Sequence, residues 1–153
     1  MSVEWLAGLV DGEGCFSIHV AERNHHGHHL SYQGRFIISM KSGHWSESAA
    51  KILRTSGVLF HQTVRNEQTS IAAVEGWKQT QKLGKLLVQH LIVKRTLVDR
   101  LLEYEPASNN RFPSRKVVQC RPKLLDFVRD FNKGKNRRYK WTGSMIMRFY
   151  ECD

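Results

Sequence analysis

The segment Leu6–Gly14 constrains the fold of this chain more than any other part of the sequence. Its apolar residues follow the 3.6-residue spacing of an amphipathic helix, and Gly8 and Gly12 lie four residues apart on one side of that helix. Glycine inside a helix costs about 1 kcal/mol relative to alanine, so two glycines in one helix need a reason. Faces made of small residues allow helix backbones to approach closely. We therefore expect Gly8 and Gly12 to lie at a close helix–helix contact. The alternative is an ordinary core helix that ends in glycines.

Beyond this helix, the hydrophobic pattern alternates between the two-residue repeat of strands and the 3.6-residue repeat of helices. Two hairpins separated by a helix indicate an α+β fold with one antiparallel sheet, in the order α-β-β-α-β-β-α-α, followed by basic helical material. At 153 residues the chain suits a single domain, with residues 1–105 as the core and residues 106–153 as a basic helical extension. We expect helices at Glu4–Gly14, Ser46–Thr55, Gly76–His90, Ile92–Glu103, Lys116–Phe131 and Gly143–Tyr150, strands at Cys15–Arg23, Ser31–Lys41, Val58–Arg65 and Gln68–Val74, a loop at Asn24–Leu30 and a linker at Pro106–Pro113.

The formal net charge of +10 is concentrated in the C-terminal third of the chain. Eleven Lys and Arg residues stand against two acids between Asn109 and Lys140, a net charge of +9, whereas residues 1–108 have a net charge of +2. A stretch this cationic repels itself unless an anion lies against it, so the charge favours nucleic acid as a partner. A basic surface that only keeps the protein in solution is the alternative.

Cysteine usage and hydropathy restrict the compartment. Cys15, Cys120 and Cys152 are odd in number and have no CxxC spacing, which favours free thiols over a disulfide scaffold or a zinc ribbon. No apolar run is long enough to span a bilayer, and acids interrupt the first fifteen residues, which argues against a secretory signal. We expect an intracellular protein in a reducing compartment, either a prokaryotic cytoplasm or an organelle, with no membrane partner.

The segment Leu6–Gly14 reads LAGLVDGEG and resembles the LAGLIDADG motif, with Val for Ile, Gly for Ala and Glu for Asp. The expected order of elements is similar to the half-domain of the LAGLIDADG homing endonucleases, αββαββα with an antiparallel DNA-binding sheet. The resemblance covers residues 3–105 well and the basic C-terminal third only in general character. For a chain with one copy of the motif, it implies a homodimer that cuts double-stranded DNA across the minor groove and leaves short 3′ overhangs on a long, nearly palindromic site, as in intron homing.

The resemblance also assigns catalytic roles. The family uses the acid at the position of Glu13 as a metal ligand, together with a neighbouring backbone carbonyl, which is that of Gly12. Mg²⁺ suits such oxygen ligands, and Mn²⁺ or Ca²⁺ could occupy the same site. The family places a lysine near the scissile phosphate, ahead of a helix, and that position matches Lys94. The alternatives are a solvated carboxylate at a helix end for Glu13 and a solvated lysine at a helix start for Lys94.

One position departs from the water-network pattern of the family, and one acid of the motif is not expected to bind metal. At its polar position near the end of the second strand this chain has Met40, and Lys41 or His44 could substitute for the missing polar group. Asp11 does not match the metal-binding position, so we expect a structural role for it.

DNA contacts are expected from the polar face of the sheet, because a two-stranded ribbon fits the major groove, where base edges can be distinguished. An exposed polar sheet face with no ligand is the alternative. The basic C-terminal run would contact phosphates without reading sequence. The expected DNA-binding residues are Ser17, His19, Arg23, Gln33, Arg35, His61, Thr63, Arg65, Gln68, Ser70, Arg137, Arg138 and Lys140.

The loop His25-His26-Gly27-His28-His29 is open to two interpretations. Adjacent histidines rarely close one tetrahedral zinc site, and no cysteine or carboxylate lies within the loop. A hairpin tip that touches phosphates, more strongly when protonated below about pH 6.5, is the simpler interpretation.

The sequence thus predicts a site-specific, Mg²⁺-dependent DNA endonuclease that acts as a homodimer. The rival is a non-cutting protein on the same fold, either an RNA splicing cofactor (maturase), with RNA as a further partner, or a transcription regulator. Retention of Glu13 favours the nuclease, and Met40 favours the rival. A basic ribosome-associated protein would leave the motif unexplained.

Overall fold

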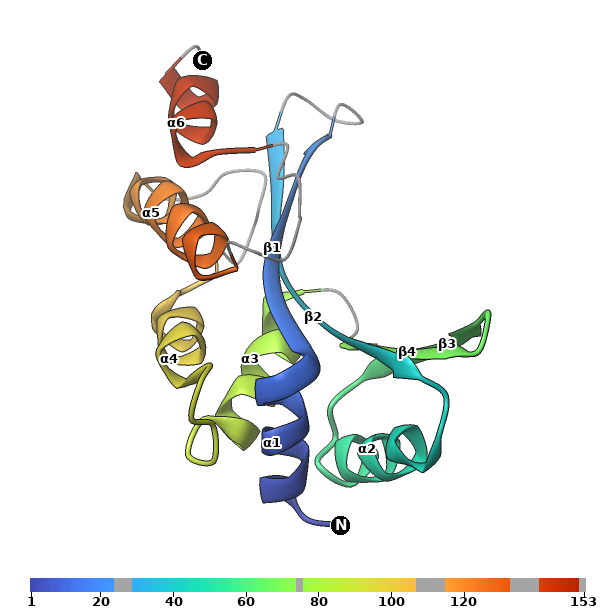
Figure 1. Cartoon of the computed structure of the whole chain (residues 1–153). Coiled ribbons are helices and arrows are strands. Elements are labelled where there is room, and N and C mark those ends of the chain that lie inside the picture. The colour runs from blue at the N-terminus through green and yellow to red at the C-terminus, as the bar shows by residue number, and fades with distance from the viewer. Residues whose placement is uncertain (24–28, 74–75, 107–114, 133–140, 152–153) are drawn as a thin grey trace. The chain divides into compact units, whose positions relative to one another are not determined.

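The computed structural model describes residues 1–23, 29–73, 76–106, 115–132 and 141–151 (Figure 1). It contains helices and a four-stranded sheet, which confirms the α+β class. No helix within these ranges is both long enough and apolar enough to cross a membrane. The elements in chain order are α1 (Val3–Glu13), β1 (Gly14–Arg23), β2 (His29–Lys41), α2 (His44–Thr55), β3 (Phe60–Arg65), β4 (Gln68–Ala73), α3 (Trp77–Leu87), α4 (Arg95–Glu103), α5 (Arg115–Phe131) and α6 (Gly143–Glu151).

Every expected helix and strand is present, and the differences lie at the ends of elements. Strand β2 begins at His29, so the end of the expected loop Asn24–Leu30 belongs to a strand, and Leu30 is buried. Helix α4 begins at Arg95 rather than at Ile92, because the preceding residues form a bend whose N–H groups donate to a side chain on α1. Cys15 and Cys120 are free thiols, as expected.

The chain divides into two compact units. One unit contains Met1–Phe16 and Gly34–Leu102, and the other contains Ser17–Gln33 and Glu103–Asp153. In the first unit, α1 contacts α2 and α3, and both of those helices contact β4. Gly34 is required there because a Cβ at this position would lie 2.9 Å from the Trp77 ring of α3. In the second unit, α5 packs against α6.

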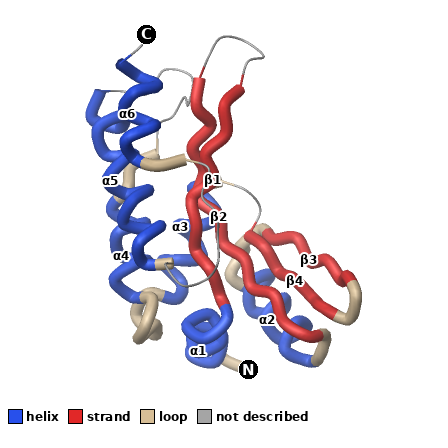
Figure 2. Tube along the Cα trace, turned by 45° about the horizontal axis from the view of Figure 1, so that its top comes forward, coloured by secondary structure: helices blue, strands red, loops and turns tan. Residues whose placement is uncertain are grey.

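The strand order in the sheet is β1-β2-β4-β3, so β3 is an edge strand (Figure 2). Strand β4 pairs antiparallel with both β2 and β3. Because residues directly opposite one another share a face, the register separates two sets of side chains. One face contains the buried Ile38 and Ile71 and packs toward helices, whereas the other is polar.

The turn between β3 and β4 has positive φ angles at both central residues, 48° at Asn66 and 61° at Glu67. This is the pattern of a type I′ turn, which matches the twist of a hairpin and favours Asn-Gly. Asparagine tolerates the left-handed region, whereas a glutamate there is strained. Asn66 therefore suits its position in the turn, whereas Glu67 adopts a strained backbone conformation.

Replacing Glu67 with glycine should therefore stabilise the protein by about 0.5–1 kcal/mol, because glycine adopts a positive φ without steric cost. The backbone carbonyl of residue 67, which accepts the Ser42 N–H at 2.6 Å, is retained in this variant. Chemical denaturation of Glu67→Gly beside wild type measures the effect. Asn66→Gly is the matched control and should change stability little. A loss of stability in Glu67→Gly would contradict the strained-turn interpretation.

Candidate nuclease site

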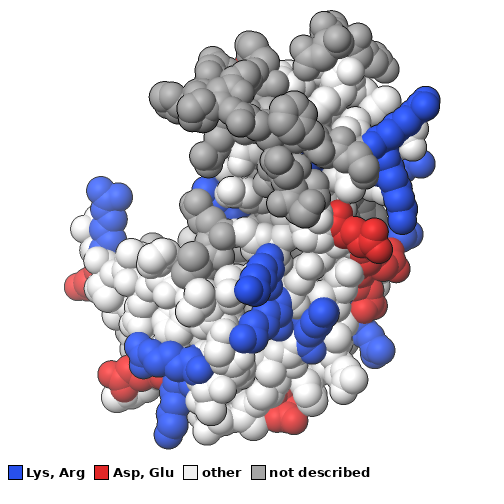
Figure 3. All heavy atoms as spheres, turned by 180° about the vertical axis from the view of Figure 1, so that it is seen from behind, with Lys and Arg blue, Asp and Glu red and all other residues white. Residues whose placement is uncertain are grey.

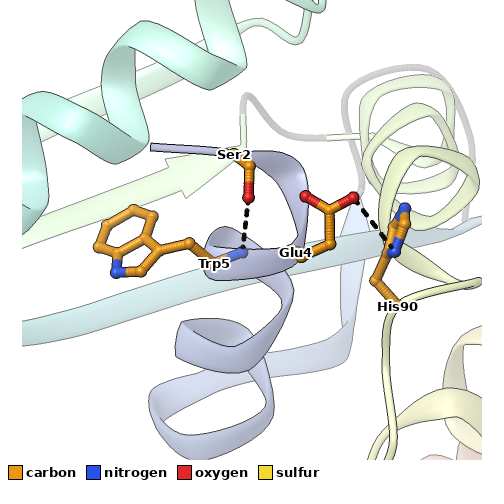
Figure 4. A network of polar contacts seen from close by, with 4 residues as sticks. All are labelled: Ser2, Glu4, Trp5 and His90. Atoms are coloured by element: carbon orange, nitrogen blue, oxygen red, sulfur yellow. Dashed lines mark hydrogen bonds and ion pairs between the residues drawn. The ribbon is translucent and has the colours of Figure 1, made fainter.

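Helix α1 presents one buried face and one exposed face. Leu6, Ala7 and Val10 are buried, whereas Gly8 and Gly12 are exposed. The helix begins at a serine cap, where the Ser2 hydroxyl accepts the Trp5 N–H at 3.5 Å. In the first turn, Glu4 lies 3.8 Å from His90, and the close-up view shows both contacts at this end of the helix (Figure 4). The motif helix is thus held at its start by local polar contacts and along its length by apolar burial.

The two motif glycines face open space. A Cβ built at Gly8 or Gly12 meets no atom within 4 Å, whereas a Cβ at Gly14 would lie 2.8 Å from the Val10 carbonyl and 3.0 Å from the Phe36 ring. Gly14 is therefore explained by packing within the chain. The cost of glycine at Gly8, in the interior of a helix, is not repaid by any close approach among the described residues.

The last turn of α1 offers oxygen atoms and contains no basic residue. Its terminal carbonyls are partly satisfied, since Val10 accepts the Gly14 N–H and Asp11 accepts the Lys94 ammonium group. Glu13, the last helical residue, is exposed. The negative end of a helix dipole together with a carboxylate favours a cation. The ligands expected from the sequence, the Glu13 carboxylate and the Gly12 carbonyl, therefore have the oxygen chemistry that suits a hard divalent ion.

Within the described ranges, no group of three or more His, Cys, Asp and Glu residues comes together to hold a metal. Of the two acids of the motif, Asp11 is partly buried and Glu13 is exposed at this helix end. The histidine loop at residues 25–28 lies outside the described residues, and the side chain of His29 is not described.

Asp11 connects the end of α1 to the bend that precedes α4. Its carboxylate accepts the backbone N–H groups of Ile92 at 2.6 Å, Lys94 at 2.8 Å and Val93 at 3.2 Å. Partial burial raises the pKa of Asp11, but the three backbone donors and the Lys94 charge outweigh burial and hold the pKa below its usual value. These contacts agree with the structural role expected for Asp11.

Lys94 lies ahead of α4, as expected, but its side chain is only 3% exposed. Its ammonium group donates to the Asp11 carbonyl, next to the proposed metal ligands in sequence. The solvated lysine considered as the alternative is therefore not what the structure shows. The bend at residues 92–94 thus binds both the side chain and the backbone of Asp11. We call this set of contacts, between Asp11 and Ile92, Val93 and Lys94, the Asp11 latch.

The polar face of β2, β4 and β3 gathers the candidate DNA-binding residues of the first unit. Strand register places Arg65, Gln68 and Lys41 in one row across the three strands. A second row contains Thr63, Ser70 and Ser39, with the last two hydroxyls 2.7 Å apart. His61 lies in a third row opposite Ala72, and alternation along β2 places Arg35 on this face as well. We call this surface the polar sheet face; its members are Arg35, Ser39, Lys41, His61, Thr63, Arg65, Gln68 and Ser70.

Sequence reasoning left Ser39 and Lys41 out of the expected DNA-binding set, although the two-residue repeat places both on the same side as Arg35. Met40 pairs with Thr69, on the opposite face. Of the two residues considered as substitutes for the missing polar group, Lys41 is exposed on the polar sheet face and His44 is exposed at the start of α2. Lys41 is thus the one that shares a surface with the DNA-binding candidates.

The remaining candidates belong to the second unit or lie outside the described residues. Ser17 and His19 on β1 and Gln33 on β2 are half-buried. Arg23 ends β1, and its side chain is not described. Arg137, Arg138 and Lys140 lie outside the described residues.

Positive charge is not confined to the sheet. Helix α3 exposes Lys78, Lys82 and Lys85 and contains no acid. On the side of the molecule seen in Figure 3, Lys and Arg side chains lie in separate groups, with Asp and Glu beside some of them. Among the described residues, the polar sheet face carries the charged residues Arg35, Lys41 and Arg65 and no acid.

Asp11→Asn should destabilise the protein by about 1–2 kcal/mol at neutral pH, because charge-assisted hydrogen bonds to three N–H groups are weakened. A depressed folded-state pKa contributes stability that is present above the unfolded pKa and is lost as pH falls through the folded value. The difference between wild type and Asp11→Asn should therefore shrink below about pH 4. Urea denaturation at pH 7 and pH 3 measures this, with the exposed Asp99→Asn as control. A pH-independent difference would contradict the role of the charge.

Comparison with known proteins gives a consistent family. The family model described as LAGLIDADG endonuclease matches residues 6–99. None of the curated proteins with which the sequence was compared matches it.

Solved structures with the same fold include the homing endonuclease I-CvuI in complex with the I-CreI target in the presence of 2 mM Mg, with the DNA not cleaved. The TM-score is 0.76 at 19% identity, covering 98% of this chain and 92% of that chain. The archaeal intron-encoded homing endonuclease I-Vdi141I, complexed with DNA, gives a TM-score of 0.68 at 16% identity, covering 98% and 94% of the two chains. The LAGLIDADG meganuclease I-AabMI, bound to uncleaved DNA, gives a TM-score of 0.62 at 18% identity. That alignment covers 98% of this chain but only 49% of the I-AabMI chain.

These likenesses establish the fold, and the family match spans the motif helix, the sheet and the Asp11 latch. The chain belongs to the LAGLIDADG endonuclease family.

Proposed function

We propose that this protein is a site-specific, metal-dependent DNA endonuclease of the homing type. It acts as a homodimer on a long, nearly palindromic site and leaves short 3′ overhangs. The observation that supports this most directly is the exposed Glu13 carboxylate at the end of a motif helix whose last turn has no basic residue. The solved structures of I-CvuI and I-Vdi141I with DNA support duplex DNA as the substrate class.

The polar sheet face is the proposed surface for the duplex. Its three cations suit phosphates, and its hydroxyl, amide and imidazole groups can exchange hydrogen bonds with base edges in the major groove. Strand β3 is exposed along His61–Arg65, so these side chains can meet DNA without displacing any part of the first unit. Ser17, His19 and Gln33 would extend the contacts along β1 and β2.

Glu13 and the Gly12 carbonyl would hold Mg²⁺ in the proposed active site. When bound, the ion would polarise a phosphate oxygen and favour hydroxide as the attacking group. The chain itself orients the ligands, since the Asp11 latch fixes the backbone two residues before Glu13. The Lys94 ammonium adds positive charge close to this helix end.

The open face of α1 supports a homodimer. Gly8 and Gly12 leave room for another helix, and the half-buried apolar side chains of Trp5 and Leu9 lie on the same helix. Cutting both strands symmetrically needs two metal sites, whereas one chain contains one Glu13. A two-fold axis along this face would bring two identical helices and two carboxylates together.

A non-cutting nucleic-acid-binding protein, such as a splicing cofactor or a transcription regulator, remains the second candidate, and Met40 is the observation that favours it. Incubating the protein with a partially randomised library of duplex sites and Mg²⁺, then sequencing the cut ends, separates the two. Cut ends that share one consensus with a constant overhang support the endonuclease. Selective binding with no cutting supports the alternative.

Glu13→Gln should lower the cleavage rate by at least about 100-fold, because a metal ion contributes several kcal/mol of charge stabilisation and the amide is a weak ligand. DNA binding should be unchanged or slightly tighter, since the substitution removes a negative charge. Single-turnover cleavage and a binding assay in Ca²⁺ measure the two effects separately. Glu4→Gln, at the other exposed end of α1, is the matched control. Cleavage by Glu13→Gln at the wild-type rate would rule out this assignment.

Gly8→Leu should abolish the dimer and slow double-strand cutting by about 100-fold, because a misplacement of about 1 Å can cost that much in rate. The leucine side chain meets nothing within one chain, so the monomer should fold normally or gain helix stability. Light scattering and circular dichroism test assembly and folding. Gly8→Ala is the milder control and should weaken dimerisation and cutting to an intermediate extent. A wild-type protein that stays monomeric on DNA yet cuts both strands would contradict the proposed assembly.

A further inference from the structure

Arg121 on α5 is completely buried, and among the residues that the structure describes it is the largest fully buried side chain. Its Nε donates to the Tyr104 hydroxyl at 3.3 Å and its Nη1 to the Tyr150 hydroxyl at 2.6 Å. The guanidinium carbon lies 5.2 Å from the centre of the Tyr32 ring, and the Tyr32 hydroxyl donates back to the Arg121 carbonyl at 2.8 Å. We call these four residues the arginine–tyrosine clasp.

The clasp joins α5, which contains Arg121, to three other segments that are far apart in sequence. Tyr32 lies on β2, Tyr104 follows α4, and Tyr150 lies on α6, while all four residues belong to the second unit. Burial raises the pKa of Tyr32 and of Tyr104, so both rings remain neutral phenols at physiological pH. A buried guanidinium is costly if its donors lose their partners, so removing one phenol oxygen destabilises the arrangement rather than leaving it neutral.

The position of Tyr32 links the clasp to DNA recognition. Tyr32 and Gln33 are consecutive on β2, so their side chains point to opposite faces of the strand. Tyr32 is fully buried in the clasp, whereas Gln33 is half-buried and is a DNA-binding candidate. Strand β1, which pairs with β2, presents Ser17 and His19 within the same unit. Holding the Tyr32 side of the strand therefore fixes the direction of the side chains on its other side.

We propose that Arg121 is a positioning residue for DNA recognition, which locks the part of the β1–β2 hairpin in this unit to α5 and α6. In this view, the C-terminal helices belong to the recognition apparatus: they set the base preference of Ser17, His19 and Gln33 without touching the bases. The inference rests on the proposed DNA-binding function.

The test uses Tyr150→Phe, which removes one hydroxyl and leaves the ring, and Arg121→Met as the stronger variant. Base preference at each position of the bound site is measured by selection from a randomised duplex library, with affinity and thermal stability in parallel. We expect preference to fall by about fivefold to tenfold in Tyr150→Phe at the positions read by β1 and β2. Positions read by β3 and β4 should keep their preference and act as the internal control.

Val128→Ala, a cavity-forming change at another fully buried position of α5, is the matched control for stability. It should lower the melting temperature without changing preference at any position. The positioning role is overturned if Tyr150→Phe lowers base preference equally at all positions of the site, or at none. It is also overturned if Val128→Ala lowers base preference only at the positions read by β1 and β2.

A separate measurement distinguishes this inference from the proposed function. Hydrogen exchange of the Ser31–Gln33 amides in the free protein should be faster in Tyr150→Phe than in wild type, whether or not DNA binds. Unchanged protection would overturn the clasp. A wild-type protein that binds no duplex while Tyr150→Phe accelerates exchange would instead refute the DNA-binding proposal and leave the clasp in place.

Discussion

The Asp11 latch is the interaction on which the proposed active site depends. One residue near the end of α1 uses its carboxylate to hold three consecutive N–H groups and its carbonyl to hold the Lys94 ammonium. These contacts connect segments more than eighty residues apart, and they fix both the exit of α1 toward β1 and the entry into α4. The metal-binding candidate is therefore placed by a residue that is not itself expected to bind metal.

Most of the fold could be predicted from periodicity, because burial alternates along β1 and β2 and the helices of the first unit each bury one stripe. The polar sheet face followed from the same repeat, and the register placed its members in rows. The turn at Asn66 and Glu67 lies where two alternating segments meet, so the hairpin was predictable while the strained φ of Glu67 was not.

The features that sequence reasoning missed depend on contacts between residues that are far apart in the sequence. Helical spacing at Ile92 was real, but the N–H groups of residues 92–94 donate to the distant Asp11 carboxylate, so α4 begins three residues later, at Arg95. Lysine at a helix start is usually solvated, whereas burial of Lys94 depends on a carbonyl on α1 that no local rule identifies. Arg121 was counted as part of a basic stretch, and its burial among tyrosines shows that formal charge overstates the surface available to an anion.

Strand β3 occupies the edge of the sheet, and even Val64, on the face opposite the polar one, is 67% exposed. Side chains there support little of the core, so their replacement costs little folding free energy. If β3 reads bases, drift at these positions can alter the preferred target while the protein continues to fold. Tolerance of this kind separates the evolution of target choice from the evolution of stability, and it makes β3 the natural place to begin a redesign of specificity.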